Sequence, residues 1–199
     1  MGNTSISFEP VSGTVLPRFA GIPTFMRLPN IALNHPDIAK VDIGLVGVPW
    51  DAGTTNRPGA RHGPRQLRDL STMIRAVHPH TGVNPFKLVN CADLGDCPVN
   101  PADIHDCLTY ITDFYDEMHE KNIVPLTGGG DHLVSLPILR GIKRKVPLSM
   151  IHIDAHTDLF DEYFGGSKFT HGTPFRRAIE EGLLDPTRVV QIGIRGTMY

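Results

Sequence analysis

Apolar residues gather in five short runs that are separated by longer polar or amphipathic stretches. The runs cover residues 42–49, 87–93, 123–127, 148–154 and 189–194. Each has the length of a strand, and the last ones are almost wholly apolar, as strands buried on both faces are. Most end in Gly, Pro or Asp, which stop a strand. The pattern predicts five core strands.

The stretches between these runs carry apolar residues at helical spacing. Helices are predicted over residues 66–77, 103–119, 131–143 and 175–182. In the second of them Ile104, Leu108, Ile111, Tyr115 and Met118 form one apolar stripe. Strands that alternate with helices favour an α/β fold. We therefore expect a three-layer αβα arrangement around a central, mostly parallel sheet.

The first forty residues lack this periodicity and are rich in Pro, Gly, Ser and Thr. We interpret residues 1–40 as an arm that wraps the domain or a neighbour and is not a core element. Residues 41–199 then form a single α/β domain with no internal boundary or repeat.

Acidic and imidazole side chains follow two of the predicted strands. Asp154, His156 and Asp158 come at the end of the fourth run, and His132 follows Gly128-Gly129-Gly130-Asp131 after the third. Alternate strand residues point the same way, so Asp154 and His156 can face one site. Functional groups of parallel sheets gather at the carboxyl ends of strands. This donor set favours a divalent cation, with Mn²⁺ first and Ni²⁺ or Zn²⁺ as further candidates.

Other interpretations of the same residues remain open. The carboxylates could cap helices or form a structural polar network, and Asp131 could cap a helix or support His132. The three glycines could suggest a phosphate cradle, but the spacing of neither phosphate-binding glycine motif is present. By alternation His152 lies on the Asp154 side of its strand, and no role follows for it from the pattern.

Several motifs together resemble the ureohydrolase (arginase and agmatinase) family. They are Gly-Gly-Asp-His at 129–132, Asp-Ala-His-Thr-Asp at 154–158, Thr-His-Gly-Thr at 170–173, the segment 17–29, Gly-Val-Pro-Trp-Asp at 47–51 and Arg-Pro-Gly-Ala-Arg-His-Gly-Pro-Arg at 57–65. The likeness covers roughly residues 15 to 196, and the segments outside the metal motifs resemble the agmatinase-type branch. The resemblance implies an arginase-like fold, here its N-terminal part.

The resemblance also implies a site with two divalent ions and a hydrolysis that yields urea and an amine. His132, Asp154 and Asp158 would bind one ion, and Asp154 and His156 the other, with Asp154 bridging. Two such ions lower the pKa of a bound water toward neutrality. His171 would act as a proton shuttle to the leaving amine, because a neutral imidazole takes and returns a proton near pH 7.

The sequence departs from the family pattern in one respect. The family has a later Asp-x-Asp-x-x-Asp-Pro strand end that completes the two-metal site, and a later catalytic Glu, and neither occurs before Tyr199. We expect either the N-terminal part of a longer protein or a truncated form that cannot build the usual site alone. A non-catalytic subunit or fragment of a ureohydrolase assembly is therefore the competing hypothesis. A deacetylase of related architecture fits the motifs poorly.

The substrate is expected to be a guanidino compound. Arginases carry an Asn two residues after the Asp-x-His-x-Asp motif, where this sequence has Phe160, which argues against arginine. Guanidinopropionase-like activity leads, agmatine or 4-guanidinobutyrate follows, and free guanidine or a biguanide with nickel remains an alternative. Phe160 and Tyr163 are expected to contact the tail of the substrate. Arg57, Arg61 and Arg65 are expected to hold loops or subunit contacts.

Composition narrows the partners and the compartment. The net charge is −2 and the pI is about 6.5, which predicts no nucleic-acid or anionic-membrane surface. The chain shows no secretory signal and no apolar run long enough to span a bilayer. The three cysteines, Cys91, Cys97 and Cys107, lack a Cys-x-x-Cys spacing and predict free thiols in a reducing, cytoplasmic setting. The resemblance implies a homo- or hetero-oligomer, a trimer or hexamer.

Overall fold

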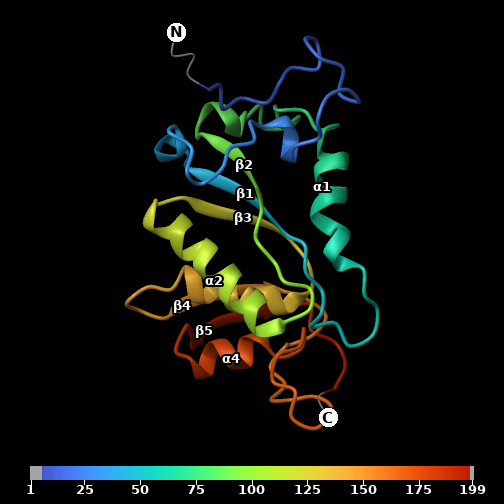
Figure 1. The fold of residues 1–199 in the computed structure, drawn as a ribbon, viewed down its shortest axis with the longest axis vertical. Coiled ribbons are helices and arrows are strands. Elements are labelled where there is room, and N and C mark those ends of the chain that lie inside the picture. The colour runs from blue at the N-terminus through green and yellow to red at the C-terminus, as the bar shows by residue number, and fades with distance from the viewer. Residues whose placement is uncertain (1–5, 198–199) are drawn as a thin grey trace.

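The structure, a computed structural model, describes residues 6–197 (Figure 1). Residues 1–5 of the expected arm and 198–199 of the expected domain lie outside the described part. The strands are β1 (Ile43–Val48), β2 (Cys91–Asp96), β3 (Val124–Gly129), β4 (Leu148–Ile153) and β5 (Leu184–Ile192). The α-helices are α1 (Gly63–Ser71), α2 (Ile104–Glu120), α3 (Ser135–Gly141) and α4 (Pro174–Glu180). Strands and helices alternate, as the sequence predicts.

Every pairing between two strands in the described part of the chain is parallel. β1 lies between β2 and β3, and β4 pairs with β5. Within residues 6–197 these are two separate parallel sheets, one of three strands and one of two. The residues that the sequence singles out follow the carboxyl ends of β3 and β4. Because these two strands lie in different sheets, strand pairing alone does not bring those residues together.

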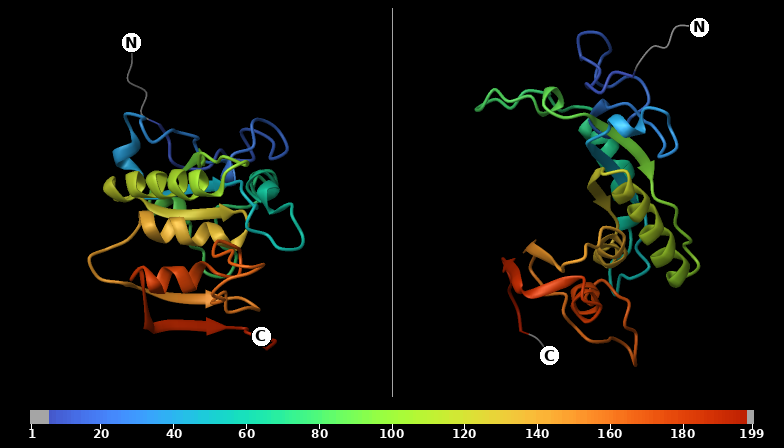
Figure 2. Two further views of the ribbon diagram at one scale, coloured as in Figure 1. Left: turned by 60° about the horizontal axis from the view of Figure 1, so that its bottom comes forward. Right: turned by 90° about the vertical axis from the view of Figure 1, so that its left-hand side faces the viewer.

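Helices join the two sheets. α2 packs on α3, and α3 packs on α4, so the three helices form one continuous layer (Figure 2). Asp103 starts α2, because its carboxylate accepts hydrogen bonds from the backbone N–H groups of His105 and Asp106. The predicted apolar stripe of α2 enters the core, where Ile111, Tyr115 and Met118 are fully buried. The core therefore sits beneath α2 and α3.

The N-terminal segment contributes to the core, and the expectation that it stays outside is wrong for Phe25, Leu28 and Ile31. The backbone N–H of Phe25 donates to Oδ2 of buried Asp93 at 2.9 Å. Arg68 holds the same carboxylate through Nε and Nη2 and stacks over the Phe25 ring. The segment lacks periodicity because isolated anchors, and not a regular element, fix it. The division at residue 40 stays a prediction.

Two predicted boundaries move for physical reasons. The helix predicted over 66–77 ends at Ser71, and beyond it Met73, Ile74 and Val77 are exposed. Further helical turns would therefore gain no stabilisation from burial of these side chains. β5 starts earlier than predicted and contains Pro186. The pairing with β4 is irregular there, since Leu184 pairs with Leu148 but Val189 with Met150. A proline is tolerated at such a bulge.

One side of β4 and β5 is an apolar face that is left uncovered by the described residues. It consists of Ile151, Ile153, Val190 and Ile192, which are each at least half exposed. On the other side Leu148 and Met150 pack against the core, which follows from the alternation of side chains along a strand. The expectation that helices cover both faces of the sheet therefore does not hold for this face within residues 6–197.

Cys91, Cys97 and Cys107 are free thiols, as the sequence predicts, and all three are buried. Among the described helices none has the length and apolar character required to cross a bilayer.

Candidate metal centre

His132 is placed by a tight crossing of backbone at the end of β3. Gly130 has a φ of +88°, and a Cβ there would lie 2.5 Å from the carbonyl oxygen of Val48 at the end of β1. Only glycine allows this approach without strain. Asp131 then caps the short helix His132–Val134, because its Oδ1 accepts from the N–H of Leu133 at 2.8 Å. The glycine run thus allows the backbone after β3 to pass close to the end of β1, and His132 follows directly after this close approach.

Asp154 and Asp158 come from the end of β4. The N–H of Asp154 still donates to the carbonyl oxygen of Ile192 on β5, at 3.1 Å, so the strand pairing fixes its backbone. Asp158 has a φ of +51° and its carbonyl oxygen accepts from the N–H of Phe175 on α4. The left-handed turn brings the carboxylate of Asp158 back toward β3, where it is buried.

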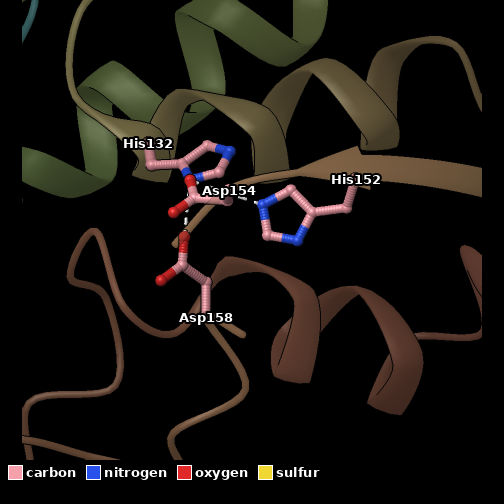
Figure 3. A group of neighbouring side chains, drawn as sticks. All are labelled: His132, His152, Asp154 and Asp158. Atoms are coloured by element: carbon pink, nitrogen blue, oxygen red, sulfur yellow. Dashed lines mark ion pairs between the residues drawn. The ribbon is translucent and has the colours of Figure 1, made fainter. Parts of the chain in front are cut away.

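These elements bring one imidazole and two carboxylates together (Figure 3). Nδ1 of His132 lies 2.5 Å from Oδ2 of Asp158 and 3.3 Å from Oδ2 of Asp154. His152 joins the group, with its Nε2 at 3.5 Å from Oδ2 of Asp154. One ligand atom of each of these four residues lies within 4.8 Å of the others. We refer to His132, His152, Asp154 and Asp158 as the strand-end cluster.

The electrostatics of the cluster favour a bound cation. Burial opposes a charge on His132, but the hydrogen bond to Asp158 and the nearby carboxylates outweigh it and raise the pKa of His132. Burial works against ionised Asp154 too, yet the backbone N–H of His156 and the charge of His132 lower the pKa of Asp154. Carboxylates kept ionised beside an imidazole nitrogen form the donor set of Mn²⁺, Ni²⁺ and Zn²⁺ sites. The residues therefore fit a divalent cation.

His156 lies at the edge of the strand-end cluster and is not one of its four members. Its backbone N–H donates to Oδ1 of Asp154 at 2.9 Å, while its Nδ1 is 3.8 Å from the same oxygen. The side chain is 73% exposed and lines the cavity above the cluster. Its expected role as a ligand of a second ion stays a prediction.

A cavity of about 660 Å³ opens over the cluster. His171, Phe160 and Tyr163 line it, together with His132, Asp154, His156 and Asp158, so the predicted site residues surround one space. The rings of Phe160 and Tyr163 have centroids 5.3 Å apart and form part of its wall. Their role as substrate contacts stays a prediction, as does the catalytic role of His171.

His171 is fixed by the loop that follows β1. Its N–H donates to the carbonyl oxygen of Gly53 at 2.9 Å, and its Nε2 lies 2.9 Å from Oγ1 of Thr55. The same loop is held from below, because Oδ2 of Asp131 accepts from the N–H of Gly53 at 2.7 Å. Asp131 thus acts as a cap and also as a support for the loop that carries Thr55.

Two of these residues have no role that the sequence predicts. Thr55 carries no motif signal, and its partner His171 lies far away in the chain. His152 has one signal, its position two residues before Asp154 on the same strand, and the structure shows that this signal was informative. Arg61 holds a loop as expected, since its Nε lies 2.5 Å from Oδ1 of buried Asp51.

The chain is thus an α/β protein with parallel strands. Imidazole and carboxylate groups meet at neighbouring strand ends beneath a cavity, and this places the chain among α/β proteins with a candidate metal site at the strand ends. The chain belongs to the arginase family, whose family model matches residues 41–199.

Comparison with known proteins agrees with this assignment. The chain is 58% identical to guanidinopropionase from Pseudomonas aeruginosa over 96% of its own length and 59% of that protein. It is 46% identical to guanidinobutyrase from the same organism, over 96% of its length and 60% of that protein. It superimposes on proclavaminate amidino hydrolase from Streptomyces clavuligerus with a TM-score of 0.83 and 40% identity, over 90% of this chain and 58% of that one. The arginase-like fold predicted from the sequence is confirmed.

Proposed function

We propose that this protein is a metal-dependent hydrolase that cleaves a guanidino group to urea and an amine, with 3-guanidinopropionate as its leading substrate. The strand-end cluster at the floor of the cavity is the observation that carries the proposed metal-dependent hydrolysis. The choice of 3-guanidinopropionate is supported by the 58% identity to guanidinopropionase. The chain spans about three fifths of the length of guanidinopropionase and guanidinobutyrase, so the activity is proposed for the protein by analogy with proteins longer than this chain.

His132, Asp154 and Asp158 would hold one divalent ion, and Asp154 and His156 a second one, with Mn²⁺ proposed and Ni²⁺ as the alternative. When bound, such ions supply Lewis acidity that activates water for attack on the guanidinium carbon. The carboxylates of Asp154 and Asp158, which line the cavity, would also attract the positive charge of a guanidinium group and favour its entry.

His171 is proposed as the group that gives a proton to the leaving amine. Thr55 and the Gly53 carbonyl hold its ring and backbone on the cavity wall. The contact with Oγ1 of Thr55 occupies Nε2 and fixes the orientation of the ring. We expect His171→Ala to lower kcat by about 10²- to 10⁴-fold, which is the usual contribution of general acid–base catalysis.

Tyr163 and Phe160 are proposed to select the tail of the substrate. Gly172 allows this wall, because a Cβ at residue 172 would lie 2.7 Å from the Tyr163 hydroxyl. We therefore expect Tyr163→Leu to change the ratio of kcat/KM for 3-guanidinopropionate over agmatine by more than about tenfold, a free-energy difference of about 1.4 kcal/mol.

The test is urea release from 3-guanidinopropionate, 4-guanidinobutyrate, agmatine, arginine, guanidine and a biguanide, after loading with Mn²⁺ or Ni²⁺. The proposal predicts the highest kcat/KM for 3-guanidinopropionate and loss of urea in Asp154→Ala. Asp113→Ala, which removes an exposed aspartate on α2, is the matched control and should keep full activity. Urea release that is the same in Asp154→Ala, or no urea from any substrate with metal bound, would contradict the proposal.

A further inference from the structure

His152 is a fully enclosed histidine at the strand-end cluster, and its ring nitrogens have different surroundings. The residue is 5% exposed, and its ring packs edge-on against Phe175 with the centroids 4.6 Å apart. Nδ1 lies 2.9 Å from Nε2 of Gln191 on β5, while Nε2 faces Oδ2 of Asp154 at 3.5 Å. Among the residues described, this Nε2 atom is buried without a hydrogen-bond partner. Whether Nε2 of His152 is a donor or an acceptor therefore depends on which ring nitrogen carries the proton.

The side-chain amide of Gln191 determines which ring nitrogen of His152 carries the proton. The amide nitrogen of Gln191 lies 2.8 Å from the carbonyl oxygen of Thr157, which can only accept a hydrogen bond. The opposite orientation of the amide would place two oxygens against each other, so the nitrogen side is fixed. The same amide nitrogen is the atom beside His152, and an amide nitrogen only donates. Nδ1 of His152 must therefore accept, and in the neutral ring the proton sits on Nε2.

We propose that His152 is not a metal ligand but a positioning residue, which carries its proton on Nε2 and directs it at the carboxylate of Asp154. Oδ2 of Asp154 faces both Nε2 of His152 and Nδ1 of His132. At 3.5 Å a proton on Nε2 attracts this oxygen electrostatically, which orients the carboxylate and leaves its remaining lone pairs for the cation. Donors of this kind raise metal affinity by holding ligands in place.

The chain of contacts links β5 to the site. Gln191 bridges Thr157 in the loop after β4 and His152 within β4, and His152 reaches Asp154. The tautomer assignment stands on these contacts alone. The effect on metal affinity rests on the proposed function, since it requires a cation at His132, Asp154 and Asp158.

The tautomer is tested directly in the metal-free chain by long-range ¹H–¹⁵N NMR, which distinguishes a protonated from an unprotonated ring nitrogen. The signals of His152 are assigned by their loss in His152→Gln. We expect a protonated Nε2 and an unprotonated Nδ1, with the unprotonated Nδ1 signal changed in Gln191→Leu. A proton on Nδ1 of His152 in the wild-type chain would overturn the proposal.

The role is tested by Mn²⁺ titration and with ¹¹³Cd²⁺. We expect His152→Phe to weaken Mn²⁺ binding about 10- to 100-fold, and His152→Gln, whose amide N–H reaches toward the same oxygen, to restore most of it. With ¹¹³Cd²⁺ bound, coupling to the ring nitrogens should appear at His132 and not at His152. Coupling at His152, or equal affinity of wild type and His152→Phe with both folded by circular dichroism, would overturn the positioning role. A wild-type chain that binds neither ion would refute both that role and the proposed metal centre, while the tautomer would still be decided by the metal-free spectrum.

Discussion

Nδ1 of His132 lies 2.5 Å from Oδ2 of Asp158, although the first residue follows β3 and the second lies in the loop after β4. β3 and β4 belong to different sheets among the described residues, so no strand pairing brings these two side chains together. The meeting depends instead on the turn at Asp158 and on its backbone bond to Phe175 of α4. The site is therefore built by loops that two rigid strands position.

Asp131 supports the site from beneath, and its removal should be costly. Its two carboxylate oxygens accept from the buried N–H groups of Gly53 and Leu133. We expect Asp131→Ala to lower the free energy of unfolding by about 2–4 kcal/mol, because two buried donors lose their acceptors. Asp131→Asn keeps one acceptor and should cost less. Denaturant unfolding measures both, and a loss in Asp131→Ala below about 1 kcal/mol would argue against this support.

Much of this architecture could be predicted because its signals are local. The strand runs and the α2 stripe follow from periodicity, and His132, Asp154 and Asp158 lie within five residues of predicted strand ends. The anchoring of Phe25 by Asp93 and Arg68 could not be predicted, since it joins three distant segments and leaves no periodic trace. The role of His152 depends on Gln191, a partner on another strand that only the tertiary fold identifies.

Asp51 should make stability depend on pH in the acid range. Burial opposes its charge, but the N–H groups of Gly59 and Arg61 and the Arg61 guanidinium outweigh burial and lower its pKa from 3.8. A lowered folded-state pKa contributes stability above the unfolded value, and this contribution is lost as the pH falls through the folded value. The difference in unfolding free energy between wild type and Asp51→Asn should therefore shrink from pH 6 toward about pH 2. A difference that stays constant over this range would contradict the assignment.

Cys97 should resist thiol reagents while the chain is folded. Burial, with smaller contributions from Cys107 and Asp96, raises its pKa to about 12. Because the thiolate is the reactive species, almost none exists at pH 8. We expect slow modification by an aromatic disulfide reagent in buffer, and rapid reaction of all three cysteines in denaturant. A thiol that reacts rapidly in the folded chain and is lost in Cys97→Ser would contradict the burial and raised pKa of Cys97.

The uncovered face of β4 and β5 should bind apolar probes. Ile151 and Ile153 lie on it with exposures of 75% and 78%, next to Val190 and Ile192. A contiguous apolar patch binds hydrophobic dyes more strongly than scattered side chains do. We expect the double variant Ile151→Thr/Ile153→Thr to reduce the fluorescence of an anilinonaphthalene dye by more than half. Ile22→Thr, which changes an exposed apolar residue on the N-terminal segment, is the control and should leave the signal unchanged.

The proposed divalent metal centre of His132, Asp154 and Asp158 is tested most directly by a titration of the chain with Mn²⁺ followed by electron paramagnetic resonance. We expect saturable binding that weakens at least about 100-fold in Asp154→Asn and in Asp158→Asn, because each removes a charged ligand. Asp113→Asn on the exposed face of α2 should bind as the wild type does. Binding that is not saturable, or that is equally strong in Asp154→Asn and the wild type, would contradict the proposed metal centre.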